Sequence, residues 1–294
     1  MPRNSLPDLP ELGVGLGYRS ALHDDTLAAR ARIDWLEIVT DRFLRGRDAE
    51  LLLELRRSFT LVPHGVELSI GSDAPLDQAY LDAVAAVADA VDAPWVSDHL
   101  AFTRERGVDL LTLAPVLRTE EKAAAVAAKA RAVEDRLGRP FLLENITYYM
   151  EMPGGLSEAE FITTVLERCD SGLLLDLNNV ATNAVNHHFD PYAFLDAIPL
   201  DRVVQVHLAG NVPEEPSGGL VVDRHDGPVS EDVFALLEYV AARVHLKAVS
   251  IERDQHFPDD FGELLDELTR TRSALAASQS IGHVTAGALT VNAR

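Results

Sequence analysis

The chain has 294 residues, of which 47% are hydrophobic and 25% are charged. This composition allows one large core, and about 250 residues suffice for a single-domain α/β barrel. The 47 acidic residues outnumber the 26 basic ones and give a formal net charge of −21, which argues against nucleic acid as a partner because a phosphate backbone is bound by clustered Lys and Arg.

The single cysteine, Cys169, excludes an intramolecular disulfide and fits a reducing compartment. It closes a helical pattern, and we interpret it as a helix residue rather than a nucleophile. The N-terminal segment lacks the apolar stretch of a signal peptide, and no run reaches the ~18 apolar residues of a membrane span. We therefore expect a cytoplasmic protein that does not contact membranes.

Short apolar runs alternate with amphipathic segments along the whole chain. The runs are rich in β-branched residues and predict strands over residues 13–17, 35–39, 60–66, 94–97, 141–144, 173–176, 203–208 and 248–252. The amphipathic segments predict helices over residues 49–57, 76–91, 119–137, 157–168, 191–197, 230–244 and 261–277. Eight strands separated by helices favour a single-domain TIM (β/α)8 barrel over residues 1–278, and the small, polar residues 279–294 predict a flexible C-terminal tail.

Polar side chains recur where the apolar runs end. In a parallel barrel these ends meet at one mouth, and imidazoles gathered with carboxylates are typical of a metal site. The candidate ligands are His64, His99, Glu144, Asp176, Asn178, His187, His207, Asp223, His225 and Glu252.

The carboxylates at these ends support a metal independently of the histidines. Glu144 and Asp176 follow apolar runs, where an unpaired carboxylate costs several kcal/mol unless a cation compensates it. The alternative is a buried ion pair, but no Lys or Arg adjoins either residue. Two further pairs, Asp176 with Asn178 and Asp223 with His225, are spaced i and i+2, which places both members on one side of an extended segment.

Ten ligands are too many for one ion and indicate two or three metals, with Glu144 bridging. Nitrogen and oxygen ligands without thiolates suit iron or manganese, and iron with open positions suits oxygen chemistry. Zinc also fits the ligand types.

Nine motifs occur in order between residues 11 and 260: GVGLGYR, DWLEIVTDRF, PHGVELSIG, VSDHLAF, LLENITYY, LLDLNNV with NAVNHHFDP, VHLAGN, DRHDGPV and SIERD. This pattern resembles the DUF692 (UPF0276) family, the multinuclear non-heme iron-dependent oxidative enzymes, which include the methanobactin-type and bufferin-type peptide-maturation oxidases. The resemblance implies a TIM barrel with two or three irons in mixed Fe(II)/Fe(III) state and O2 as co-substrate. It implies a ribosomally made precursor peptide as substrate, modified commonly at cysteine, and a small partner protein that presents the peptide.

The resemblance also implies a division of the ligands. One iron is expected at His64, His99 and Glu144, and a second at Asp176, His207 and Glu252 with Glu144 shared. A third is expected at Asn178, His187, Asp223 and His225. The chain departs from the family pattern at Asn211, where some relatives carry histidine, and at NHH in place of NHG.

Two other classes of protein fit parts of the pattern. One is a zinc or manganese hydrolase or isomerase of the xylose-isomerase-like or endonuclease IV-like barrel type, although the acidic charge argues against the endonuclease. The other is a non-catalytic metal- or peptide-binding barrel, against which open coordination positions argue. Oxygen uptake with a peptide separates the oxidase from both.

Overall fold

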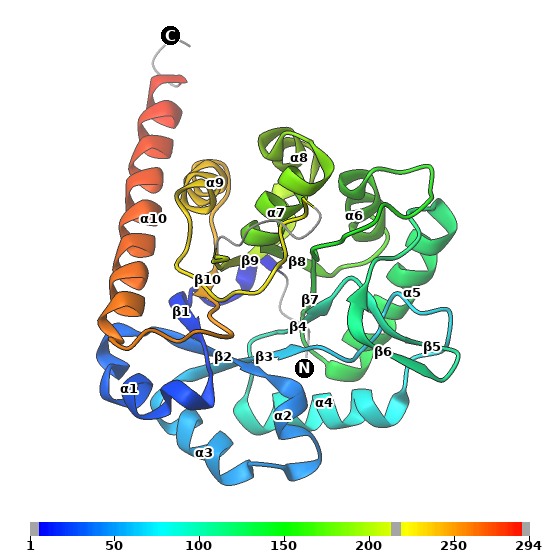
Figure 1. The fold of residues 1–294 in the computed structure, drawn as a ribbon, viewed down its shortest axis with the longest axis horizontal. Helices are drawn as coiled ribbons and strands as arrows, with labels where there is room; N and C mark the ends of the chain where they lie inside the picture. Colours follow the sequence, from blue (N-terminus) through cyan, green and yellow to red (C-terminus); the bar gives the residue numbers. More distant parts are fainter. Residues whose placement is uncertain (1–5, 213–218, 290–294) are drawn as a thin grey trace.

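Eight parallel strands close into a barrel with helices around it (Figure 1), in the order β1-β10-β9-β8-β7-β4-β3-β2. The structure, a computed structural model, describes residues 6–212 and 219–289. The strands are β1 (Gly13–Gly17), β2 (Trp35–Val39), β3 (Thr60–Gly65), β4 (Val96–His99), β7 (Phe141–Glu144), β8 (Gly172–Asp176), β9 (Val203–Leu208) and β10 (Ala248–Ile251). The predicted TIM (β/α)8 barrel is therefore confirmed.

The helices cover the outer face of the barrel. They are α1 (His23–Ala28), α2 (Thr40–Phe43), α3 (Ala49–Ser58), α4 (Gln78–Val91), α5 (Glu120–Leu137), α6 (Glu158–Leu166), α7 (Leu177–His187), α8 (Pro191–Ala197), α9 (Glu231–Ala241) and α10 (Gly262–Leu289). Short 3-10 turns lie at Leu6–Asp8, Ser20–Leu22, Arg30–Arg32, Leu44–Gly46 and Leu200–Arg202. Ser157 and Glu160 start α6 with a capping box, because each side chain binds the other's backbone N–H.

The interior of the barrel has an apolar floor below a polar mouth. Successive side chains of a strand point to opposite faces, so each second residue of a strand enters the interior. On β3, β7 and β8 an apolar residue is followed two positions later by a polar one. The pairs are Val62 and His64, Leu142 and Glu144, and Leu174 and Asp176. Each strand therefore contributes first to the core and then, at its C-terminal end, to the mouth.

Close packing fills the floor. Trp35 and Trp95 are fully buried there with Val62, Leu142 and Leu174. Glycine on β1 makes room for one of the indoles, because a Cβ atom at Gly15 would lie 2.5 Å from the Trp35 ring.

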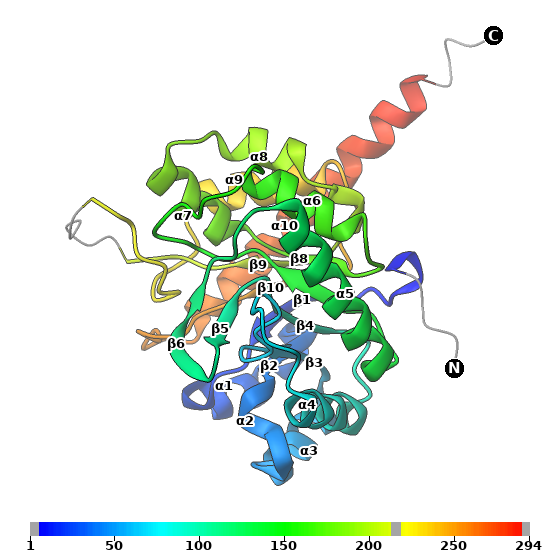
Figure 2. The same ribbon diagram turned by 90° about the vertical axis from the view of Figure 1, so that its right-hand side faces the viewer.

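A hairpin that the sequence did not predict projects at the mouth. Strand β5 (Phe102–Glu105) pairs with β6 (Val108–Ala114) after β4, with an irregular register between the two strands. Leu111 on β6 has a φ of 55° and is 87% exposed. Figure 2 shows the hairpin at the same end of the barrel as the chain that follows β9.

Several predicted boundaries were wrong. The chain after Asp176 is the helix α7 and not an extended segment, and α6 ends at Leu166, so that Cys169 lies in the turn beyond it. Helix α10 continues past residue 277 to Leu289 and crosses the predicted start of the tail; residues 290–294 lie outside the described part, and the domain division stays a prediction. Within residues 6–212 and 219–289, no helix has the length and apolarity that crossing a bilayer requires.

Candidate metal centre

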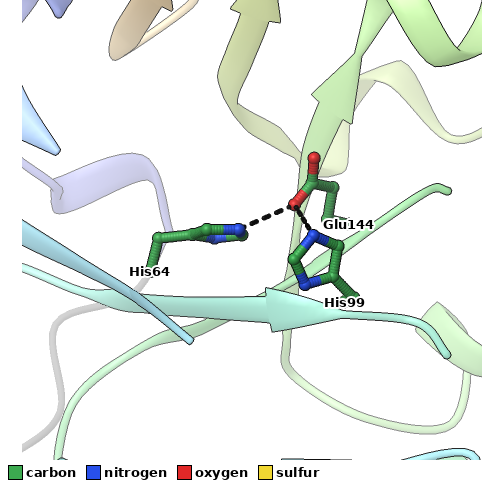
Figure 3. Close-up of side chains that lie close together, drawn as sticks. All are labelled: His64, His99 and Glu144. Carbon is green, nitrogen blue, oxygen red and sulfur yellow. Dashed lines mark ion pairs between the residues drawn. The ribbon is translucent and has the colours of Figure 1, made fainter. Parts of the chain in front are cut away.

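Three strand ends bring His64, His99 and Glu144 together at the mouth (Figure 3). Glu144 Oε2 lies 3.2 Å from Nε2 of His64 and 3.3 Å from Nε2 of His99. This oxygen is buried and makes no hydrogen bond within the described residues. Two imidazole nitrogens and a carboxylate oxygen therefore face one point without satisfying one another.

The remaining ring nitrogens of these histidines have partners of their own. Nδ1 of His64 lies 2.9 Å from the Ser97 hydroxyl, and Nδ1 of His99 lies 3.2 Å from the carbonyl oxygen of Gly65. Such contacts hold each ring with Nε2 toward Glu144, the arrangement usual for metal-binding histidines.

A second group shares Glu144 and lies deeper in the barrel. Nδ1 of His207 is 3.2 Å from Glu144 Oε1, 3.1 Å from Glu252 Oε2 and 3.9 Å from Asp176 Oδ2. One oxygen of Asp176 accepts the Asn179 N–H at the start of α7. The other, Oδ2, is buried without a hydrogen-bond partner among the described residues and faces the group.

A third group shares Glu252. Nδ1 of His225 lies 3.3 Å from Glu252 Oε2 and 3.6 Å from Asp254 Oδ2, while its Nε2 lies 2.9 Å from Asp223 Oδ1. The loop is held by Asn211, whose side-chain oxygen accepts the backbone N–H groups of Arg224 and His225. Asn211 thus shapes the loop that carries His225.

Three predicted ligands lie outside these groups. Asp223 meets Nε2 of His225, the ring nitrogen that does not face Glu252 and Asp254, and the other two are displaced for reasons of secondary structure. Asn178 is in the first turn of α7, not on a strand, and donates to Asp223 Oδ1 at 2.8 Å. His187 ends α7 instead of lying in a loop; its ring stacks on Tyr148 at 4.2 Å and its Nε2 lies 2.8 Å from the Tyr148 carbonyl oxygen. Metal binding by any of the three stays a prediction.

Sequence reasoning missed three charged residues at the site. Glu37 on β2 lies 2.8 Å from His207 Nε2 and is 2% exposed. Asp254 belongs to the third group, and Arg19 pairs with Asp254 and lies 3.5 Å from Glu252. Glu37 carried a usable signal, since it is a carboxylate inside the apolar run WLEIV.

The surroundings of His64 and His99 favour the neutral form of both rings. Burial, the neighbouring His207 and, for His64, the neighbouring His99 lower the pKa values of these rings, that of His99 to about 4 and that of His64 well below its usual range. Neutral imidazole is the form that binds a metal. Burial also raises the pKa of Glu144 to about 7, with the charges of Glu252 and Glu37 adding to the effect.

Neighbouring carboxylates raise the pKa values of the other two histidines, His207 and His225. Burial disfavours the charged form of His207, but the carboxylates of Glu252, Glu37 and Glu144 outweigh it and raise its pKa well above the usual range. The pKa of His225 is likewise raised against burial, by Asp223 and Glu252. The three carboxylates around His207 are therefore stable together only when positive charge lies among them.

The donor set fits two or three metal ions. Within the described residues, the ion-pair partners of Glu144 are imidazoles, so no Lys or Arg compensates its charge. Orphaned oxygens on Glu144 and Asp176 face the groups, and two carboxylates are each shared between two groups. The one cysteine is elsewhere, buried against Val165, and burial raises the pKa of its thiol.

Comparison with known proteins agrees with this architecture. Residues 13–276 match the family described as the RiPP precursor modification enzyme MbnB/TglH/ChrH, where RiPP denotes a ribosomally made, post-translationally modified peptide. A UPF0276 protein of Caulobacter vibrioides (strain NA1000 / CB15N) is 38% identical over 271 residues, which are 91% of this chain and 95% of the relative.

Solved structures share the fold at lower identity. Endonuclease IV of Thermus thermophilus superposes with a TM-score of 0.56 at 19% identity, covering 90% of this chain and 99% of its own. The TTHB071 protein of the same organism, soaked with ZnCl2, gives a TM-score of 0.53 at 20% identity and covers 87% and 97%. Over nearly its whole length, and with the ligand groups at its mouth, this chain belongs to the MbnB/TglH/ChrH family of RiPP precursor modification enzymes.

Proposed function

We propose that the protein is a multinuclear non-heme iron enzyme that uses dioxygen to oxidise a ribosomally made precursor peptide, at cysteine. The observation that carries the proposal is the linkage of three ligand groups through Glu144 and Glu252. Shared carboxylates hold neighbouring metal ions close together, as multinuclear catalysis requires. Membership of a family of precursor-modifying enzymes supports the peptide as substrate.

The residues that would hold the metals are those of the three groups. His64, His99 and Glu144 would hold one ion, and Glu144, Asp176, His207 and Glu252 would hold another. A third would be held by His225 with Glu252 and Asp254, with Asp223 and the predicted ligand Asn178 beside them. His187, the remaining predicted ligand, stacks on Tyr148. Nitrogen and oxygen ligands with open positions suit iron, which supplies one-electron redox chemistry toward oxygen.

A cavity of about 380 Å³ lies over the groups and gives the reaction its space. His64, His99, Glu144 and His225 are among its lining residues, so a bound side chain would meet the ligand groups directly. The residues of its walls include Val39, Val66, Thr112, Leu113, Thr147, Tyr149 and Asn179. The apolar members exclude water, and the hydroxyl and amide groups can orient a peptide backbone.

Exposed apolar side chains surround the mouth and support a peptide or protein ligand. Among the described residues, most of the exposed large apolar side chains lie between the C-terminal end of a strand and the next helix of the barrel. They are Val108, Leu110, Leu111, Leu117, Tyr149, Met150, Val212, Val221 and Val222, whereas Leu53, Val185 and Tyr192 lie on helices. We expect this apolar rim to contact the precursor peptide and the small partner protein that presents it.

The single Cys169, buried and unpaired, fits the reducing cytoplasm, where we place the enzyme.

Oxygen uptake tests the proposal. Neighbouring genes are searched for short cysteine-bearing peptides, and protein purified without oxygen and loaded with Fe(II) is mixed with each one while the oxygen consumed and the peptide mass are followed together. The proposal expects oxygen uptake that depends on the peptide, with a matching mass change. The same peptide with cysteine replaced by serine is the control. Iron-loaded protein that leaves both oxygen and peptide unchanged would overturn the proposal.

A further inference from the structure

A buried carboxylate lies behind the inner ligand group, on the side of His207 away from the mouth. Glu37 is on β2 and His207 on β9, and β1 and β10 separate these strands around the barrel. Their contact therefore crosses the interior. Both side chains are buried, Glu37 at 2% and His207 at 0% exposure. A carboxylate in so dry a place requires specific partners.

Hydrogen bonds fix how Glu37 faces the imidazole. Nε2 of His207 lies 2.8 Å from Oε1 and 3.0 Å from Oε2 of Glu37. Gln205, two residues before His207 on β9, donates its amide N–H to Glu37. The amide cannot turn the other way round, because its oxygen accepts the indole N–H of Trp95 at 2.8 Å. The amide therefore presents only donors to Glu37 and to the ring.

This network determines which nitrogen of His207 bears the proton. Nε2 lies at hydrogen-bond distance from both oxygens of the Glu37 carboxylate, which can only accept, and the Gln205 amide donates to Glu37 and Ser250, so Nε2 donates to Glu37. In the neutral ring Nδ1 then has the free lone pair, and Nδ1 is the atom that faces Glu144, Glu252 and Asp176.

His207 thus differs from the other two histidines around Glu144. His64 and His99 turn Nε2 toward Glu144, and their Nδ1 atoms contact a hydroxyl and a backbone carbonyl. In His207 the nitrogen that faces away from Glu144 is Nε2, and it contacts the carboxylate of Glu37. A carboxylate behind a ligating imidazole fixes its orientation and increases its basicity more than a neutral partner does.

We propose that Glu37 is a positioning residue that makes His207 an Nδ1 ligand and strengthens metal binding by the group Glu144, Asp176, His207 and Glu252. Its charge acts on the metal through the imidazole and not by touching the substrate. The inference rests on the proposed metal site, but it requires neither iron nor oxygen chemistry.

Zinc, a diamagnetic probe, tests the inference in the full-length protein. The variants are E37Q, which keeps the size of the side chain and removes the charge; S97A, which removes the neutral partner of His64; and E37Q/Q205E, which moves the carboxylate to the neighbouring position on β9. Zinc affinity is measured by competition with a chelator. The tautomer of His207 is read from long-range proton–nitrogen NMR spectra of protein labelled with [15N]histidine, with the His207 signal identified in H207N.

We expect E37Q to bind the zinc of the inner group about 10- to 100-fold more weakly and to lose the pattern of an Nδ1-bound, Nε2-protonated ring. E37Q/Q205E should recover much of the affinity, since the displaced carboxylate still lies near Nε2. S97A should weaken a different zinc and leave the His207 signal unchanged. Circular dichroism shows whether each variant is folded, and the double variant keeps the test decisive if E37Q alone unfolds.

An E37Q protein with wild-type zinc affinity and a wild-type His207 signal would contradict the inference, as would an E37Q/Q205E protein that folds but binds no better than E37Q. Wild-type protein that binds no metal would instead contradict the proposed function, so the two failures are distinguishable.

Discussion

The same strands build the floor and the mouth of the barrel, from residues two positions apart. The floor buries apolar side chains, whereas the mouth buries polar ones. At the floor Val62, Leu142 and Leu174 are fully buried in an apolar cluster, and their side chains have no polar atoms. At the mouth Glu144 and Asp176 are as deeply buried, yet each keeps an oxygen without a hydrogen bond among the described residues. The floor therefore stabilises the fold, whereas the mouth costs stability in the absence of a cation.

The change Glu144→Gln should have the largest effect, because this carboxylate belongs to two groups. We expect metal affinity at both groups to fall at least about 100-fold, more than the loss of an outer contact produces, and oxidation to fall below detection. The metal-free variant should be as stable as the wild type to within about 1 kcal/mol, since an amide needs no cation. Metal analysis and urea unfolding measure the two effects, and a strongly destabilised metal-free variant would contradict the contrast.

The change Leu174→Ala is the matched test of the floor. It leaves a cavity below Asp176 on the same strand and should lower the free energy of unfolding by about 2–5 kcal/mol. The folded fraction should still bind metal with wild-type stoichiometry. Loss of metal from well-folded protein would show that floor and mouth are not separate in function.

Lower pH should weaken metal binding without weakening the floor. Burial, with the nearby carboxylates, raises the pKa of Glu144 to about 7, and the pKa values of His207 and His225 are raised against burial by their carboxylate neighbours. These groups hold protons in the metal-free protein and must release them to bind a metal. Affinity should therefore rise with pH between about 6 and 8.

Calorimetry in two buffers of different ionisation enthalpy measures the protons released. His64 and His99 should release no protons in this pH range, because their pKa values are lowered. Binding that releases no protons would show that the inner groups are already deprotonated.

The change Asn211→Ala should act on one group only. It removes the acceptor for the backbone N–H groups of Arg224 and His225. We expect the group around His225 to lose affinity about tenfold, and the protein to lose about 1 kcal/mol of stability. Metal titration should show one weakened site, and equal weakening of all sites would contradict the assignment of Asn211 to this loop.

The smallest effect is expected at Leu111, an exposed residue on strand β6 of the hairpin. Leu111→Ser removes an apolar side chain that contributes nothing to the core, so stability should change by less than about 0.5 kcal/mol. If the apolar rim binds the peptide, KM should rise up to about tenfold with kcat unchanged. Leu53→Ser, on α3 away from the rim, is the control. An unchanged KM would remove Leu111 from the peptide-binding surface.

Sequence patterns were sufficient for the barrel because a buried parallel strand is a short apolar run with a polar residue where it reaches the mouth. They failed for α7, whose sequence LNNVATNAVNH has many residues of low helix propensity. That helix begins because the Asp176 side chain caps it, a contact that depends on where β8 ends. Because α7 was not predicted, Asn178 was expected on a strand and His187 in a loop, whereas both lie in this helix.

The hairpin and Glu37 were missed for different reasons. Strands β5 and β6 pair with an irregular register. Local periodicity in the sequence does not encode such a pairing. Glu37 interrupts an apolar run just as Glu144 does, and the reasoning applied to Glu144 would have identified it. What the sequence could not show is that Glu37 meets His207 across the barrel, since that pairing depends on closure.

The most direct test of the account is the metal content of protein purified without oxygen, with Mössbauer spectra of the same sample. We expect two to three irons per chain in a mixed Fe(II)/Fe(III) state, and a clear loss of iron in E144Q. Stoichiometric zinc or manganese without iron would contradict it and would favour a hydrolase or isomerase.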